Sequence, residues 1–309
     1  MRRAFVEALV AAASMDERIV LLTGDLGFMA LEPFRDQFPD RFFNMGVAEQ
    51  NMVGVATGLA EAGCVPFCYS IVPFAVLRPF EFIRNGPVFH GLPVRIVGMG
   101  GGFDYGNAGP THYGIEDVGA MRLLQGLAVI APADARQVAT AVSMLSDWSG
   151  PAYLRLGKQG ETVAGLDGRF EFGKVQRVRH GSDAVVFAMG GISTSVVEAA
   201  ESLEAGGISV EVVVVSSVNP CPVEDILGVV SSHRRAVTVE AHVMTGGLGS
   251  LVAEVIADYG VPCRLLRIAV EEPYGRSGGS QSYLHALHGL STEALVTRVS
   301  AFVGTDSPS

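Results

Sequence analysis

The sequence has few charged residues, and fewer of them are basic than acidic. Charged side chains make up 17% of the 309 residues, and 22 Lys and Arg stand against 32 Asp and Glu, which gives a formal net charge of −10. No Lys/Arg cluster provides the electrostatic footprint that binding to nucleic acid requires, so we expect no nucleic-acid partner. The small charged fraction also indicates that much of the surface is buried against other subunits.

Long apolar runs are missing as well. No stretch approaches the roughly 20 consecutive apolar residues of a membrane span, so we expect no membrane contact. Residues 1–18 begin with two arginines, at positions 2 and 3, before an apolar run, but Glu7, Asp16 and Glu17 interrupt that run. The apolar spacing is more typical of an amphipathic helix than of a signal peptide, and we therefore expect a cytoplasmic protein.

Cysteine is scarce and has no metal-binding spacing. The four cysteines, which form no C-x-x-C pair, are Cys64, Cys68, Cys221 and Cys263. We interpret them as reduced side chains near buried strands rather than as metal ligands.

Apolar segments and glycine are abundant, at 49% hydrophobic residues and 38 glycines. Continuous apolar segments such as 18–25, 92–100 and 127–134 indicate buried strands, and helical patterns such as 47–63 and 135–148 lie between them. Apolar strands that alternate with helices predict mostly parallel sheets covered on both faces, which is the α/β class.

The length predicts two such domains, each large enough to bury its own core. The polar, glycine-rich segment 159–173 is typical of a linker. We therefore expect a first domain over residues 1–162, a linker over 163–178 and a second domain over 179–305.

The stretch FFNMGVAEQNMVGVATGLA, residues 42–60, places Glu49 at the start of a helix of small and apolar residues. Burial disfavours an ionised carboxylate, whereas a helix N-terminus favours one. Such a residue can hold or share a proton near neutral pH. From composition alone, a first-turn glutamate that only complements the helix dipole is the more common case.

This stretch resembles the transketolase and deoxyxylulose-phosphate synthase family, in which G-[IV]-x-E-[QH] carries a glutamate that contacts N1′ of the aminopyrimidine of thiamine diphosphate. Gly46, Gly54, Gly58 and Leu59 also match the family. The resemblance implies that Glu49 is catalytic and binds the cofactor, favouring the imino tautomer that deprotonates the thiazolium ring. It also implies two doubly wound domains, a pyrimidine-binding domain followed by a transketolase C-terminal domain.

The segment VPFCYSIVPFAVLRPFEFIRN, residues 65–85, is similar to the family's segment that stacks on the aminopyrimidine. Phe74 is the candidate stacking residue, because a flat aromatic ring suits a flat heterocycle. The segment is one residue shorter than the family pattern, so Tyr69 is an alternative. Arg78 and Arg84 match family arginines, and Arg78 is a candidate either for substrate binding or for pairing with a carboxylate.

The block GPTHYGIED, residues 109–117, matches a pattern specific to transketolase-like enzymes. By resemblance, His112 lies in the substrate channel and binds substrate oxygens. Sugar-phosphate transketolases carry a histidine and an aspartate where this chain has Gly100 and Ala108, which puts ordinary pentose-phosphate recognition in doubt. Asp104 or Asn107 is a candidate to compensate.

Two further segments match the family. In PAYLRLGKQGE, residues 151–161, Lys158 stands where the family holds a substrate phosphate, and Arg155 is nearby. A solvated lysine is an equally good interpretation. In TGDLG, residues 23–27, the resemblance implies that Asp25 reaches the cofactor's neighbourhood across a subunit contact.

The diphosphate motif of the family is missing from the sequence. That motif reads G-D-G and ends in an asparagine about 25–30 residues later, because Asp and Asn hold the metal that neutralises the diphosphate. Here Leu26 replaces the second glycine and Asn44 comes too early. The resemblance therefore implies an N-terminal partner subunit with the G-D-G motif, which would hold Mg²⁺ or Ca²⁺, in an α2β2 heterotetramer with a homodimeric core. No metal ligand is expected on this chain.

The turn GGLGS, residues 246–250, could suggest a phosphate site in the second domain. In the family this domain mainly supports dimerisation, so packing is the favoured interpretation. Glu240 and His242 are then residues of an interface, or residues that support the site from behind, rather than catalysts.

The leading hypothesis is a subunit of a split transketolase that transfers a two-carbon ketol unit from a ketose or 2-oxo donor to an aldehyde acceptor. Three alternatives remain open: the beta subunit of a 2-oxo-acid dehydrogenase, a decarboxylating ligase like deoxyxylulose-phosphate synthase, and a non-catalytic regulatory or assembly subunit. The GPTHYGIED block argues against the first, and the presence of both Glu49 and His112 argues against the last.

Overall fold

A seven-stranded sheet organises the first half of the chain in the computed structural model, which describes residues 1–158, 160–272 and 278–304. The strand order is β10-β5-β6-β4-β3-β1-β2, and every pairing is parallel except that of β10 with β5. The strands are β1 (Ile19–Thr23), β2 (Phe42–Asn44), β3 (Val65–Ile71), β4 (Arg95–Met99), β5 (Ala128–Ile130), β6 (Ala152–Leu156) and β10 (Ser217–Asn219).

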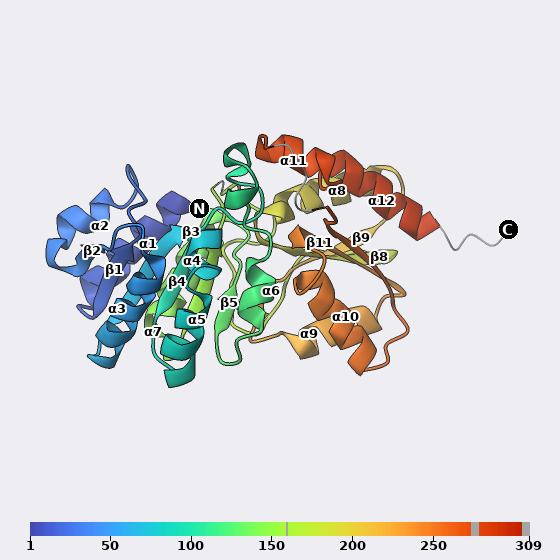
Figure 1. Ribbon diagram of the computed structural model, residues 1–309. Helices are drawn as coiled ribbons and strands as arrows, with labels where there is room; N and C mark the ends of the chain where they lie inside the picture. Colours follow the sequence, from blue (N-terminus) through green and yellow to red (C-terminus); the bar gives the residue numbers. More distant parts are fainter. Residues whose placement is uncertain (159, 273–277, 305–309) are drawn as a thin grey trace.

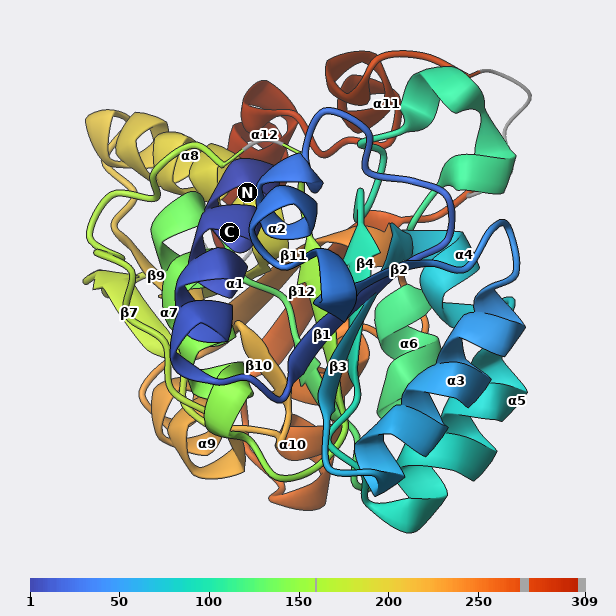
Figure 2. The ribbon, with the colours of Figure 1, turned by 90° about the vertical axis from the view of Figure 1, so that its left-hand side faces the viewer.

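Helices cover both faces of this sheet (Figure 2). One face packs against α1 and α7, whose apolar side chains form one core, and the other packs against α3, α4 and α6. The helices of this unit are α1 (Arg2–Met15), α2 (Glu32–Gln37), α3 (Glu49–Glu61), α4 (Val72–Val76), α5 (Phe80–Ile83), α6 (Asp117–Arg122) and α7 (Ala135–Asp147). Short helical turns are η1 (Pro39–Arg41), η2 (Arg84–Val88), η3 (Gly106–Ala108) and η4 (Pro110–His112).

Helix α7 shows how the sequence specifies these elements. Asp134 caps the helix by accepting a hydrogen bond from the backbone N–H of Gln137. Val138, Ala141, Val142 and Leu145 recur at helical spacing and are all buried against the sheet. The polar positions between them remain on the outer face.

The second half of the chain forms a five-stranded sheet in the order β12-β11-β8-β9-β7, in which only the β7–β9 pairing is antiparallel. Its strands are β7 (Gln176–Arg179), β8 (Ala184–Met189), β9 (Val210–Val214), β11 (Arg235–Val243) and β12 (Arg264–Val270). The helices are α8 (Ser193–Ala205), α9 (Val223–Ser231), α10 (Leu248–Asp258), α11 (Gln281–Leu287) and α12 (Thr292–Gly304), with the turn η5 (Gly190–Ile192) before α8. Helices α8 and α12 lie on one face of the sheet, and α9 and α10 on the other (Figure 1).

The predicted fold class is confirmed, because both halves are α/β units with mostly parallel sheets. The apolar stretch 209–218, which the sequence presents as one strand, is two strands in the structure. It leaves the second sheet after Val214 and joins the first sheet at Ser217, where it pairs with Ile130. Periodicity cannot reveal this change of sheet, because both strands are buried.

The two units are therefore joined by a shared strand and by a continuous apolar core. The domain limits at residues 162 and 178 remain predictions, and residue 305 lies outside the described residues. Within the described ranges, no helix is long and apolar enough to cross a lipid bilayer. All four cysteines are free thiols.

Candidate active site

The carboxyl ends of the parallel strands β1, β3 and β4 meet at one edge of the first sheet. Ligands of open α/β sheets bind outside this edge, where the loops that follow the strands come together. The predicted site residues Glu49, Phe74 and His112 all belong to segments that leave this edge.

Glu49 is the first residue of α3, and only 1% of its surface is exposed. Its Oε1 accepts a hydrogen bond from the hydroxyl of Ser70, 3.3 Å away at the end of β3. Its Oε2 forms a short ion pair with the guanidinium of Arg78. Gly24 lies on the β1 side of the carboxylate, where a Cβ would be 3.4 Å from Oε1. The carboxylate is thus held between two neighbouring strands.

Phe74 and His112 extend this group toward the surface. The Arg78 guanidinium that pairs with Glu49 also lies 4.6 Å above the centre of the Phe74 ring. The imidazole of His112 meets Phe74 edge to face, with the ring centres 5.1 Å apart. The Thr111 hydroxyl is 3.0 Å from His112 Nδ1. The structure therefore brings Glu49, Arg78, Phe74 and His112 into one continuous series of contacts.

Tyr69 does not join this series. Side chains along a strand alternate between the two faces, so Ser70 points to Glu49 while Tyr69 points to the opposite face. There the Tyr69 ring is buried and stacks on Phe5, with the ring centres 5.9 Å apart. This placement favours Phe74 over Tyr69 as the stacking residue.

Asp25 and Asn107 lie on exposed loops. Asp25 follows β1, and its carboxylate accepts a hydrogen bond of 2.9 Å from the amide of Asn44, which ends β2. Asn107 belongs to the turn η3, one turn before His112. Neither residue contacts Glu49 or Phe74 among the interactions that the described part of the chain makes.

The two cations near the end of β6 have different environments. Lys158 is exposed, and its Nζ lies 4.7 Å above the ring of Tyr105. Arg155 is buried, and its Nε donates to the Asp117 carboxylate at 2.8 Å. Tyr153 donates to the same carboxylate oxygen at 2.6 Å. Asp117, the last residue of the GPTHYGIED block, thus forms a buried ion pair with Arg155.

Gly100, the position where sugar-phosphate transketolases have a histidine, has a positive φ of 88°. A Cβ there would lie only 2.2 Å from Cδ2 of Tyr105. The Tyr105 ring therefore fills the space that a side chain at position 100 would need.

The GGLGS turn is occupied by the protein's own carboxylate. Glu240 accepts hydrogen bonds of 2.7 Å from the backbone N–H groups of Leu248 and Gly249, at the start of α10. Its burial raises the pKa of this carboxyl, while the nearby His242 and these N–H groups act in the opposite direction. His242 Nε2 accepts from the N–H of Gly119 at 3.1 Å and so connects the two units. These contacts support the packing interpretation of this turn.

Sequence reasoning did not find Ser70, Gly24 or Tyr105, which each lack a chemical signature of their own. Only the strand register shows that Ser70 faces Glu49, and only the tertiary structure places Tyr105 over Gly100. Across the described residues, no group of three or more His, Cys, Asp or Glu side chains could hold a metal ion.

Comparison with known families identifies both units of the chain. A family model described as the transketolase pyrimidine binding domain matches residues 1–161, and a second, the transketolase C-terminal domain, matches residues 173–295. The chain belongs to the transketolase family. Within this family it comprises a pyrimidine-binding domain and a C-terminal domain, so the predicted resemblance is confirmed.

Other transketolase chains are similar to this one over nearly their whole length. It is 36% identical to a Methanocaldococcus jannaschii protein provisionally named transketolase C-terminal section, over 97% of this chain and 95% of that one. It is 32% identical to one of the subunits of the apulose-4-phosphate transketolase of Actinobacillus succinogenes, over 94% of both chains. A solved structure described as a split gene transketolase, inactive beta4 tetramer, superposes with a TM-score of 0.89 at 36% identity and covers 98% of this chain and 97% of that one.

Proposed function

We propose that this chain is the subunit of a two-subunit, thiamine-diphosphate-dependent transketolase in which Glu49 contacts the aminopyrimidine of the cofactor. The observation that carries this proposal is the placement of Glu49, a buried carboxylate that Arg78 connects to the half-buried ring of Phe74. The reaction is transfer of a two-carbon ketol unit from a ketose or 2-oxo donor to an aldehyde acceptor.

The residues present fit the pyrimidine end of this cofactor. Gly24 presents no side chain where a Cβ would lie 3.4 Å from Glu49 Oε1, so the backbone leaves room beside the carboxylate. Glu49 Oε1 has only the 3.3 Å hydrogen bond from Ser70 and can take a stronger partner. Phe74 offers a flat aromatic surface a short distance away, on the far side of Arg78.

Each residue then has a separate role. Thiamine diphosphate, when bound, supplies the carbanion chemistry of the reaction. Glu49, itself buried, would hold a proton at a nitrogen of the aminopyrimidine. Phe74 would orient the heterocycle by stacking. His112, positioned by Thr111, would donate a hydrogen bond to a substrate oxygen.

The partner subunit would supply the metal site that holds the diphosphate, with the G-D-G motif and Mg²⁺ or Ca²⁺, in an α2β2 assembly. Exposed apolar side chains beside the site support such a contact. Phe28 is 70% exposed, Met29 93% and Val47 72%, and they flank Asp25 and Glu49 in the sequence. Large apolar side chains gathered at one edge are typical of surfaces that another subunit covers. Asp25 would then reach the cofactor's neighbourhood across this contact.

Lys158, Arg78 and Asn107 are the proposed substrate-binding residues. The exposed Nζ of Lys158 and the adjacent Tyr105 ring form a surface suited to a phosphorylated substrate. Because Tyr105 covers Gly100, the donor is recognised differently from the substrates of sugar-phosphate transketolases that have a histidine there. The free thiols of the four cysteines support a cytoplasmic site of action.

Replacing Glu49 by Gln in the complex reconstituted with the partner subunit tests the proposal. We expect donor cleavage to fall by about 100-fold or more, because a general acid–base contact is lost, while the complex still assembles. Glu61→Gln, at the exposed end of the same helix, is the matched control and should leave turnover unchanged. Unchanged donor cleavage in the Glu49 variant would refute the assignment.

The isolated chain provides a second test. If the diphosphate site belongs to the partner, the cofactor should bind the isolated chain weakly or not at all, as measured by calorimetry, and binding should appear when the partner is added. Tight binding to the isolated chain would contradict the two-subunit site.

A further inference from the structure

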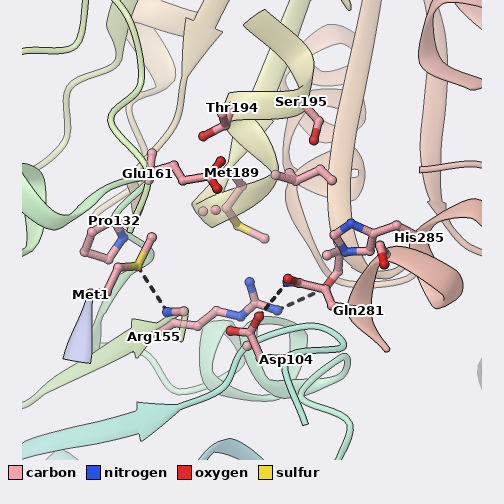
Figure 3. A pocket seen from close by; sticks show the side chains of 18 of the residues that line it. Met1, Asp104, Pro132, Arg155, Glu161, Met189, Thr194, Ser195, Gln281 and His285 are labelled. Carbon is pink, nitrogen blue, oxygen red and sulfur yellow. Dashed lines mark hydrogen bonds between the residues drawn. The ribbon is translucent and has the colours of Figure 1, made fainter. Parts of the chain in front are cut away.

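A cavity of about 330 Å³ lies between the two units, and none of the proposed cofactor or substrate residues lines it. Figure 3 shows Arg155 and Asp104 on one side of this cavity and the start of α8, with Thr194 and Ser195, on the other. Its size is at the lower end of the range in which proteins bind small molecules.

The cavity is the place where the carboxyl ends of both sheets meet. Gly101 follows β4 and Gly157 follows β6 in the first sheet, while Gly190 follows β8 in the second. Loops at this end of parallel strands form the ligand sites of α/β proteins. The cavity therefore has a position suited to binding in both units at once.

Helix α8 begins at the wall of this cavity without a side-chain cap. The hydroxyl of Ser193 donates inward to the carbonyl of Gly190, at 2.8 Å, and so does not cap the helix N–H groups. The turn η5 runs directly into α8, and the backbone N–H of Ser193 also donates to the Gly190 carbonyl. The N–H groups that follow in the first turn of a helix attract negative charge. The helix has 13 residues, long enough for this effect. In α10, by contrast, the carboxylate of Glu240 occupies the equivalent place.

Arg155 adds a buried cation that points into the cavity. Its side chain is only 5% exposed. Nε is bound by Asp117, and Nη2 donates to the carbonyls of Gly114 and Ala241. Nη1 points toward α8 (Figure 3) and makes no hydrogen bond with any residue in the described part of the chain. A Cβ at Gly190 would lie 3.4 Å from Nη1, so the free amino group and the turn before α8 face the same space.

We infer that this cavity is a second anion-binding site, which takes the phosphate group of a small phosphorylated polyol between Arg155 Nη1 and the N-terminus of α8. Guanidinium groups and helix N-termini are the two groups that proteins most often use to bind phosphate. The hydroxyls of Thr194 and Ser195 stand at the same helix start and can donate to the phosphate oxygens.

The opposite wall is suited to the hydroxyl groups of such a ligand. Asp104 lines the cavity and accepts hydrogen bonds from Lys158 N–H at 2.7 Å and from the Gln281 amide at 2.5 Å. A carboxylate has further lone pairs with which it can accept from a ligand hydroxyl. Asp104 also accepts a hydrogen bond from the backbone N–H of Lys158, the proposed substrate-binding residue. A ligand bound to Asp104 in the cavity would therefore affect the position of the loop after β6.

A binding assay on the full-length chain with a matched set of variants tests this site. Thr194→Asp places a carboxylate in the first turn of α8, which favours the helix but occupies the anion's position. Thr194→Val removes only the hydroxyl. Ser202→Asp adds the same charge at an exposed position near the far end of α8. The ligands are inorganic phosphate, a sugar phosphate and the same sugar without its phosphate, and the readouts are calorimetry and thermal shift.

The sugar phosphate should bind and raise the melting temperature, and inorganic phosphate should compete with it. Thr194→Asp should weaken this binding by about tenfold or more, Thr194→Val by less, and Ser202→Asp should leave it unchanged. Binding of inorganic phosphate as tight as that of the sugar phosphate would show that the site takes the anion without its polyol and would overturn the polyol part. Binding unaffected by Thr194→Asp, or binding of the unphosphorylated sugar alone, would overturn the anion site. Because the assay needs no turnover and no partner, its outcome is independent of the proposed catalytic role.

Discussion

Arg78 connects the two ends of the candidate active site, because its guanidinium pairs with the buried Glu49 carboxylate and also lies 4.6 Å above the ring of Phe74. The carboxylate is 1% exposed, whereas the Arg78 side chain is 38% exposed. The pair is therefore buried on one side and open to water on the other. The same arginine fixes the carboxylate and limits access to the aromatic ring.

Replacing Arg78 by Gln should destabilise the chain. The substitution leaves Glu49 buried without its cation, which in a fully buried pair costs about 3–5 kcal/mol. Because Arg78 is partly exposed and water can replace it, we expect a loss of about 1–3 kcal/mol in the free energy of unfolding. Urea denaturation measures this loss. Arg84→Gln, an exposed arginine in the same segment, is the control, and an equal loss in both variants would contradict the role of the pair.

Replacing His112 by Phe should separate binding of the cofactor from use of the substrate. The variant retains an aromatic contact with Phe74 but has no ring nitrogen for a substrate oxygen. In the reconstituted complex we expect kcat/KM to fall about 100-fold, with cofactor affinity unchanged. His90→Phe, on an exposed turn, should have full activity. Normal kcat/KM in the His112 variant would remove this residue from the site.

Gly100 and Tyr105 should behave as a coupled pair. Gly100→Ala imposes a positive φ on a residue with a side chain and drives its Cβ into the Tyr105 ring, so we expect a loss of about 2 kcal/mol or more. Gly109→Ala has a similar φ of 85° but meets nothing within 4 Å, and it should cost only the backbone strain, about 1–3 kcal/mol.

The double variant Gly100→Ala with Tyr105→Ala isolates the contact between the two side chains. Removal of the ring should make the Gly100 substitution less costly than it is in the wild-type background, by about 1 kcal/mol in a double-mutant cycle. Strict additivity of the two substitutions, measured by thermal unfolding, would show that the ring does not fill this space.

His285 should make the stability of the chain fall at acid pH. Burial, with a smaller contribution from His288, lowers the pKa of this histidine from 6.5 to about 4. The folded state therefore favours the neutral ring, and the unfolded state binds a proton first as the pH falls. The contribution of the neutral ring to the free energy of unfolding is fully present above pH 6.5. It is lost as the pH falls from 6.5 to about 4, by up to about 3 kcal/mol.

Unfolding of His285→Gln as a function of pH checks this expectation. The variant should lose less stability than the wild type between pH 6.5 and 4, because it has no ring to protonate. His180→Gln, at an exposed position, should follow the wild-type curve. If the stability of His285→Gln falls with pH in parallel with that of the wild type, other groups cause the loss of stability at acid pH.

The sequence by itself determined the fold class and the residues that carry the proposed chemistry. Continuous apolar strands between amphipathic helices allow only a sheet covered on both faces, and α7 with its Asp134 cap forms where its pattern predicts. Glu49 and His112 were recognisable because their motifs resemble those of the transketolase family, and Phe74 was the candidate in a similar segment that is one residue shorter than the family pattern. Arg78 was expected to pair with a carboxylate or to touch the substrate, and the structure shows the first.

The tertiary structure alone decided what these residues touch. Contacts between distant segments depend on strand register and loop packing, which no local pattern encodes. Register turns Ser70 toward Glu49 and Tyr69 away from it, and loop packing places Tyr105 over Gly100. The crossing of the chain from β9 to β10, and the meeting of Arg155 with the start of α8, likewise exist only because the two units pack edge to edge.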